Sequence, residues 1–369
     1  MTGKSHHSQS LKRNLYGWLL IGPFVLSLVA FFAFALVRTF GYSFTQYDLF
    51  SAPQWVGLEN YLQLFQDTMF IKAFTNTISF SVVVTVLQTA LALMLAVLIN
   101  GNIRGKGFFR TVYYIPSIMS SAAVTLIFVW FYQKNGFLND FLSGLHNHQL
   151  WILALISIFA VSQTSFYLWL KAKKITAKLT DPVGAIISLA IALLVTGILS
   201  RMAIIPIGIE RVEVSWLGTN DMVGPLPVTM WAIVIQNIFT TVPTLMLLFL
   251  AGLQGIPQDY YEAATIDGAN KWQQHWHITV PQLAPVTFVV ITMGIIGTLQ
   301  MFDQVALLGA GVPLESRITL AYYVYAYAFP DGSSPRIGIA SAAALVLGLL
   351  TVVLVAIQKR FGIKEHQNG

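Results

Sequence analysis

The stretch Glu262-Ala263-Ala264-Thr265-Ile266-Asp267-Gly268, followed nine residues later by Ile278-Thr279-Val280-Pro281, is the most informative part of this chain. It is polar, contains strong helix formers, and lies between two long apolar segments. Nothing in lipid requires such a loop, so we expect it to lie in water and to contact another molecule there. Its apolar neighbours define the class of protein that carries it.

The composition is that of a membrane protein. Charged residues make up 10% and hydrophobic residues 56% of the chain, and the mean hydropathy is +0.69. A soluble domain carries about a quarter charged residues, and a helix needs about 20 mostly apolar residues to cross the hydrocarbon. We predict an all-α polytopic membrane protein with about eight transmembrane helices, at Tyr16–Val37, Thr77–Leu98, Thr111–Phe131, Leu150–Leu170, Val183–Ser200, Val228–Ala251, Val286–Leu308 and Ile337–Ile357.

The basic residues predict the orientation, because cytoplasmic connections of membrane proteins collect Lys and Arg. If the N-terminus is inside and the eight segments alternate, fourteen of the 21 Lys and Arg residues fall on the cytoplasmic side. This predicts that both termini and the Glu262 loop are cytoplasmic. The same rule accounts for the net charge of +6, so we expect a lipid bilayer and no nucleic acid as partner.

No metal site is expected. Cysteine is absent, and the pairs His146/His148 and His275/His277 have neither a carboxylate nor a third ligand at suitable spacing. The first apolar segment is too long for a signal-peptide core of about 7–15 residues, so we expect it to be retained.

Catalytic motifs are missing as well. The glycine-rich turn at 101–107 lacks the spacing and the hydroxyl of a phosphate-binding loop. We therefore expect no catalytic residue, no cofactor in this chain, and no enzyme activity. A gradient-driven carrier usually buries ionisable groups in its helices, and only Asp303 and Arg201 come near this pattern. Uphill transport would then draw its energy from another polypeptide.

The loop itself predicts a short helix–turn–helix. Asp259 is placed to cap the first helix, and Glu262 in its first turn would face the positive end of the helix dipole. The Ala263-Ala264 pair forms helix readily and leaves little bulk on one face. Gly268 would end this helix in the left-handed conformation, and a second short helix is expected from Asn270 until Pro281. Another protein could approach the small residues closely, although an ordinary connecting loop is the alternative.

This motif resembles the cytoplasmic loop of the membrane subunits of binding-protein-dependent ABC importers, with Val280 in place of the usual leucine. In that family the loop is a coupling helix that docks into the ATPase subunit. The resemblance implies that Glu262, Ala263, Ala264 and Gly268 form this joint, with Asp267 beside it.

Further stretches resemble the sugar class of the family, specifically the first permease subunit of the maltose-transporter type. They are Trp55–Tyr61, Arg104–Arg110, Ala251–Pro257, Phe302–Gln304 and Leu308–Pro313. The resemblance covers residues 12–144 and 214–361. It implies a second permease subunit, two cytoplasmic ATPase subunits that bind ATP and Mg²⁺, an external or periplasmic solute-binding protein, and a bacterial cytoplasmic (inner) membrane location.

The expected organisation is a six-helix permease core with an inserted hairpin. Residues 1–14 form a cytoplasmic tail, and 15–144 hold the first three transmembrane helices with an external loop at 39–75. Residues 145–213 form the inserted transmembrane hairpin, which is either a lipid-facing appendage or a contact for a partner. The remaining core helices lie at 214–358 with the coupling loop at 252–285, and 359–369 form the second cytoplasmic tail.

A polar solute that crosses lipid needs hydrogen-bonding side chains inside the bundle. Two apolar segments provide candidates for this pathway, namely Asn237, Thr240, Thr241, Thr244, Thr298, Gln300 and Asp303. The alternative for each is a hydrogen bond between helices. By resemblance, Asn237 matches an asparagine of the maltose-type sugar site, whereas Thr240, Thr241 and Thr244 depart from it and Thr298 stands where that subunit also has asparagine.

We therefore expect a non-catalytic permease subunit of an ATP-driven importer for a sugar, an oligosaccharide or a glycoside-type compatible solute. The alternatives are an importer of the same architecture for another small solute such as a polyamine, and a gradient-driven carrier that works alone.

Overall fold

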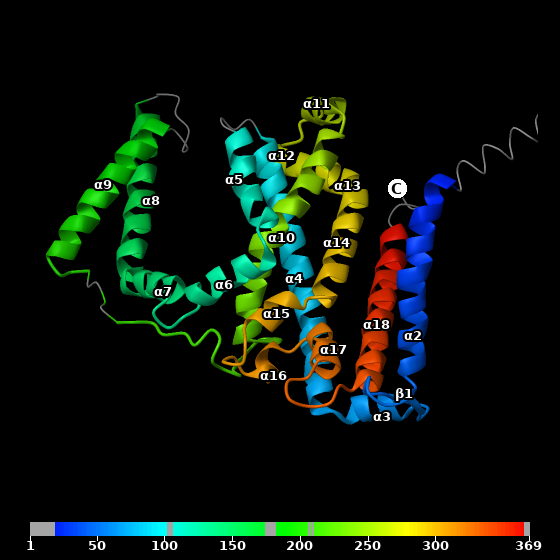
Figure 1. The fold of residues 1–369 in the computed structure, drawn as a ribbon. Coiled ribbons are helices and arrows are strands. Elements are labelled where there is room, and N and C mark those ends of the chain that lie inside the picture. The colour runs from blue at the N-terminus through cyan, green and yellow to red at the C-terminus, as the bar shows by residue number, and fades with distance from the viewer. Residues whose placement is uncertain (1–18, 102–105, 174–181, 206–207, 209, 365–369) are drawn as a thin grey trace, which may run out of the picture. The chain divides into compact units, whose positions relative to one another are not determined.

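The computed structural model describes residues 19–101, 106–173, 182–205, 208 and 210–364 (Figure 1). These residues fall into two compact units, residues 1–126 with 218–369 (unit 1) and residues 127–217 (unit 2). The strands in the described part are two short antiparallel pairs, β1 (Thr45–Gln46) with β2 (Gln54–Trp55) and β3 (Met222–Val223) with β4 (Leu226–Pro227).

Helices make up most of both units. Unit 2 contains α7 (Phe137–Asn147), α8 (Gln149–Ala172) and α9 (Pro182–Arg201). α6 (Ser121–Phe131) runs across the boundary between the units. The helices of unit 1 are η1 (Leu28–Ala33, a π-helical segment), α2 (Phe34–Tyr42), α3 (Glu59–Gln66), α4 (Thr68–Asn100), α5 (Lys106–Ile118), α10 (Val228–Gln254), α11 (Gln258–Ile266), α12 (Lys271–Gln274), η2 (His275–Thr279, also π-helical), α13 (Val280–Gln282), α14 (Ala284–Leu299), α15 (Asp303–Leu307), α16 (Leu314–Arg317), α17 (Leu320–Ala328) and α18 (Ile337–Lys364).

Seven of the eight predicted membrane segments are confirmed as helices long and apolar enough to cross a bilayer. The third segment was predicted as one continuous helix over Thr111–Phe131, and the prediction of continuity is wrong. The segment breaks between Ile118 and Ser121, and the two halves are bent by 102°. Pro116 lies inside α5 just before the break, where it cannot donate a backbone hydrogen bond.

Unit 1 is built around α4, which packs along α10 on one side and α14 on another. A buried cluster near the coupling loop joins Ala92 and Ala96 of α4 to Met246 and Phe249 of α10 and to Leu283. Two more clusters follow toward the other end of α4, where α17 and α18 also pack. In Figure 1, α11 lies at one end of unit 1, and α3 with β1 lies at the other.

A carboxylate–tyrosine cluster fixes the end of unit 1 opposite α11. Asp67 caps α4 by accepting a hydrogen bond from the Met69 amide at 2.9 Å. Its other oxygen accepts from the hydroxyls of Tyr323 at 2.6 Å and Tyr327 at 2.7 Å. Burial opposes ionisation of Asp67, but these hydrogen bonds outweigh it and hold the pKa of the carboxyl below its ordinary value of 3.8.

The replacement Asp67→Asn should lower the free energy of unfolding of the purified chain at pH 7 by about 1–2 kcal/mol, because it removes charge-assisted hydrogen bonds. The pKa of Asp67 is lower in the folded state than in the unfolded state, so the ionised carboxyl stabilises the fold above about pH 4. This stabilisation is lost as the pH falls through the folded-state pKa. Melting temperatures of wild type and variant, measured between pH 3 and 7, should therefore converge at the acid end. A constant difference across this range would contradict the assignment.

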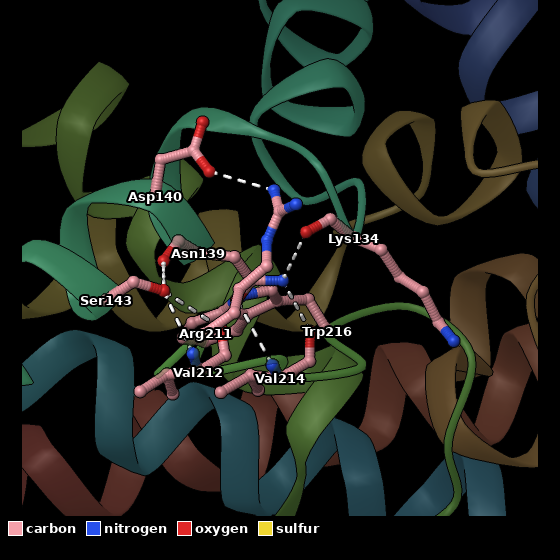
Figure 2. A network of polar contacts seen from close by, with 8 residues as sticks. All are labelled: Lys134, Asn139, Asp140, Ser143, Arg211, Val212, Val214 and Trp216. Atoms are coloured by element: carbon pink, nitrogen blue, oxygen red, sulfur yellow. Dashed lines mark hydrogen bonds and ion pairs between the residues drawn. The ribbon is translucent and has the colours of Figure 1, made fainter. Parts of the chain in front are cut away.

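In unit 2 an extended segment, residues 210–217, runs back along α7 and is bound to it by hydrogen bonds (the return segment; Figure 2). Asn139 is fully buried and uses both ends of its amide. Its Nδ2 donates to the carbonyls of Lys134 and Val214, and its Oδ1 accepts from the Val214 amide and the Trp216 indole, at 3.0–3.2 Å. The Ser143 hydroxyl likewise accepts a hydrogen bond from the Val212 amide at 2.9 Å. The side chains of α7 thus replace the neighbouring strand that the return segment lacks.

The replacement Asn139→Ala should release the return segment, because it leaves buried backbone groups of Val214 without partners at a cost of about 1–3 kcal/mol. Trypsin should then cleave after Arg211 at least several times faster. The matched control is Asp140→Asn, which removes only the exposed ion pair to Arg211 at 3.0 Å and should change cleavage little. Equal rates in the two variants would show that Asn139 does not hold the segment.

Candidate functional site

The predicted coupling loop, residues 252–285, contains α11 and the turn that leads to α12. Gly268 has φ +82°, which confirms the predicted left-handed stop. The Ala269 amide bonds back to the Ala264 carbonyl at 2.8 Å, as at a glycine-terminated helix. Asn270 begins the second helix with a reciprocal capping box to Gln273. Each helix of the loop therefore has a defined end, and the turn between them is rigid.

Two details of the predicted loop are wrong. The residue that caps α11 is Pro257, and Asp259 lies inside the first turn instead. Glu262 consequently falls in the second turn, so the helix dipole contributes less to it than expected. The second helix, predicted from Asn270 until Pro281, is confirmed to within one residue as α12, η2 and α13, which succeed one another from Lys271 to Gln282. Proline is tolerated there because it occupies the first turn of α13.

One side of the loop is anchored to the bundle. Tyr261 and Ile278 pack against the buried cluster around Phe249 and Leu283. The Tyr261 and Thr279 hydroxyls are 2.9 Å apart and share a hydrogen bond, which joins α11 to the helix that leads into α14. α11 is thereby fixed to the run of helices that continues into α14.

The other side of the loop is open. Glu262, Ala263, Asp267 and Gly268 are exposed, and Ala264 is partly covered. Ile266 is 87% exposed, although it is the most apolar residue of α11. It follows Glu262 and Ala263 at helical spacing, so these three share one face. Ile266 was not among the site residues predicted from the sequence. It could have been found as the one branched aliphatic residue in the polar sequence of α11.

The structure separates the predicted pathway residues into three groups. Asn237 and Thr241 share a hydrogen bond of 3.3 Å on one face of α10, with Thr240 and Thr244 close by in the helix. Thr244 is exposed and the other three are half-buried, so α10 presents an open polar stripe. The remaining residues of the prediction lie elsewhere. Thr298 is in the interface between α14 and α4, whereas Gln300 at the end of α14 and Asp303 at the start of α15 are exposed.

The interface between α4 and α14 contains a polar seam that the sequence analysis did not find. Ser81 of α4 shares a hydrogen bond of 2.8 Å with Thr298. One to two turns further on, Thr85 and the nearly fully buried Gln88 face Gly294. None of the described residues gives the Gln88 amide or the Thr85 hydroxyl a hydrogen-bond partner. The signal was present in the spacing 81, 85, 88, which places these residues on one helix face.

The contact between Gln88 and Gly294 leaves no room for a side chain. A Cβ at Gly294 would overlap Gln88 Nε2 and lie 3.2 Å from Thr85 Cγ2. Gly294→Ala should therefore separate α4 from α14, at a cost of about 1–3 kcal/mol, and should reduce transport. Gly297→Ala is the matched control on the same helix, because a Cβ there meets nothing within 4 Å and alanine forms helix better than glycine. Thermal unfolding of the two purified variants tests this, and equal melting temperatures would contradict the tight contact.

Comparison with known proteins agrees with this geometry. The family described as "Binding-protein-dependent transport system inner membrane component" matches residues 170–364, which is more than half of the chain. The chain is 28% identical to the multiple sugar-binding transport system permease protein MsmF of Streptococcus mutans, over 94% of this chain and 97% of that protein. It is also 28% identical to the trehalose/maltose transport system permease protein MalF of Thermococcus litoralis, over 92% and 89%.

Solved structures show the same fold. A bacterial ABC transporter involved in the import of the acidic polysaccharide alginate superposes with a TM-score of 0.69 at 19% identity, covering 97% of this chain and 99% of that one. The same type of transporter, in complex with an alginate pentasaccharide-bound periplasmic protein, gives a TM-score of 0.68 at 18% identity.

The membrane spans and the family match define a multi-pass permease of the inner membrane. The chain belongs to the binding-protein-dependent transport system inner membrane component family of ABC importers. The matched range begins at residue 170 and includes α9, so it does not separate the hairpin from the core, and the insertion of 145–213 stays a prediction.

Proposed function

We propose that this chain is a translocation subunit of an ATP-driven importer for a sugar, an oligosaccharide or a glycoside-type compatible solute. The observation that carries the proposal is α11, a helix with a rigid turn, one anchored side and one open side. The names of several relatives, which include sugar-binding, lactose and trehalose/maltose systems, support the solute class.

In this proposal two ATPase subunits bind ATP and Mg²⁺ in the cytoplasm and receive the face of Glu262, Ala263 and Ile266. The chain itself catalyses no reaction. Its solute arrives from an external or periplasmic solute-binding protein. A second permease subunit covers the stripe on α10, because half-buried amides and hydroxyls facing lipid are costly.

The chemistry of α10 supports a neutral solute. The helix carries amide and hydroxyl groups at Gln236, Asn237 and Thr241 but no charged side chain along its whole length. A polyamine would require carboxylates at this stripe and an anionic solute would require basic groups. A gradient-driven carrier is disfavoured too, because charged side chains in the described membrane spans lie only within a few residues of the ends.

The coupling role is tested in the assembled importer, reconstituted in vesicles with its ATPase subunits and solute-binding protein. Ile266→Asp should reduce both solute uptake and solute-stimulated ATP hydrolysis at least tenfold, because a charge on the exposed apolar residue opposes docking. Ile266→Leu should restore both activities. Lys271→Gln, an exposed change on the other side of the turn, is the control and should leave them unchanged.

A second variant separates coupling from solute handling. Asn237→Ala should weaken uptake while the ATPase subunits still copurify with the permease. Uptake that survives Ile266→Asp would remove α11 from the joint, and uptake by the purified chain without ATP would favour the gradient-driven carrier. Stimulation by a solute-binding protein loaded with a polyamine, but not with a sugar, would overturn the proposed solute class.

A further inference from the structure

The hairpin of α8 and α9 carries an apolar groove and a basic end, and neither belongs to the coupling loop or to the polar stripe. The groove has a volume of about 320 Å³ and is lined by Leu155, Ile156 and Phe159 of α8 and by Ala185, Ile186 and Leu189 of α9. All six side chains are apolar. A groove of this kind between membrane-spanning helices stays dry, so an apolar group fills it.

The two helices are joined closely beside the groove. Gly184 allows α9 to approach Phe166, because a Cβ there would lie 2.8 Å from the ring. The Ser162 hydroxyl donates to the Ser188 carbonyl at 3.3 Å. These contacts fix the spacing of α8 and α9, so the groove is a feature of the hairpin itself.

The basic end lies where α8 finishes. Lys171 and Lys173 are exposed, and the Lys173 ammonium lies 4.6 Å from the centre of the Trp169 ring. The salt bridges found among the described residues do not involve either lysine. The carboxylates that the structure describes in unit 2 are Asp140 of α7 and Glu210 and Glu213 of the return segment, near the other end of α8. Tryptophan next to lysine at a helix end is typical of the headgroup level of a bilayer.

The groove lies within one leaflet of the basic end. On α8, Lys171 is twelve residues from Phe159 and sixteen from Leu155, which corresponds to about 18–24 Å along the helix. On α9 the lining begins at Ala185, three residues after the helix starts at Pro182. A leaflet with its headgroups is about 20 Å thick, so when the lysines lie at the headgroups the groove extends along the length of one acyl chain.

We propose that the hairpin binds an anionic phospholipid, with its phosphate beside Lys171 and Lys173 and one acyl chain in the groove. Charge complementarity selects an anionic headgroup over a zwitterionic one, since each lysine near a headgroup contributes to such binding. A second apolar helix would fill the groove but would not engage the charges of Lys171 and Lys173. One lipid molecule accounts for both features.

The headgroup is tested by native mass spectrometry of the full-length chain in detergent, titrated with phosphatidylglycerol or with phosphatidylcholine of the same acyl chains. Phosphatidylglycerol should bind at one molecule per chain and at least tenfold more tightly. The double variant Lys171→Gln/Lys173→Gln should lose roughly 30-fold in affinity for phosphatidylglycerol. The control Lys72→Gln/Lys134→Gln removes two exposed lysines elsewhere and should retain it.

The groove is tested by Ala185→Phe, which fills it while both lysines remain. This variant should also lose the bound phosphatidylglycerol, whereas Ile198→Phe, an exposed position of α9 outside the groove, should keep it. Circular dichroism confirms that each variant keeps its helical content. Equal binding of the two lipids, unchanged binding by the double lysine variant or by Ala185→Phe, or displacement by free glycerol phosphate would overturn the proposal. A dimer that Ala185→Phe abolishes would assign the groove to a second copy of the chain.

Discussion

Every polar group that a helix carries into the hydrocarbon needs a partner inside the protein, and the arrangement of unit 1 depends on this constraint. Ser81 and Thr298 tie α4 to α14. Gln236 of α10 donates to Thr125 of α6 at 2.6 Å. Gln358 of α18 donates to the Phe288 carbonyl and accepts from Thr292, both on α14. Apolar side chains provide most of the contact area, but lipid tails are as apolar as the protein interior, so apolar burial alone does not favour one helix pairing over another. These polar pairs therefore select which faces of the helices meet.

α14 is connected to the predicted coupling loop through a run of short helices. The end of α14 nearest α11 leads back through α13, η2 and α12 to this loop, and Tyr261 ties that run to α11. The middle of α14 lies against Gln88, whose amide has no partner among the described residues. An unpaired buried amide costs about 1–3 kcal/mol, which a small shift of α14 along α4 could relieve. The seam is therefore an energetically costly contact in the packing of α4 against α14.

Much of this could be predicted from the sequence because the signals are local. Runs of apolar residues predicted the spans, Gly268 the left-handed stop, and Asn270 the start of the second helix. The bend after Ile118 and the placement of Asp259 depend on where a helix begins and ends, which propensity defines poorly. The separation of Thr298 from Asn237 could not be predicted at all, because periodicity shows which residues share a face and not which neighbour that face meets. The seam at Ser81, Thr85 and Gln88 was visible as a spacing, but its partner on α14 was not.

The polar stripe on α10 is an open surface of the described chain. Asn237 and Thr241 are half-buried, and Thr244 is exposed. Lipid against these groups would leave them unsatisfied, whereas water or a second polar helix would satisfy them. The faces of α8 and α9 show the opposite pattern, since their outward residues are almost entirely apolar and suit lipid without help. The difference between these two faces supports the proposal that a second permease subunit covers the stripe on α10.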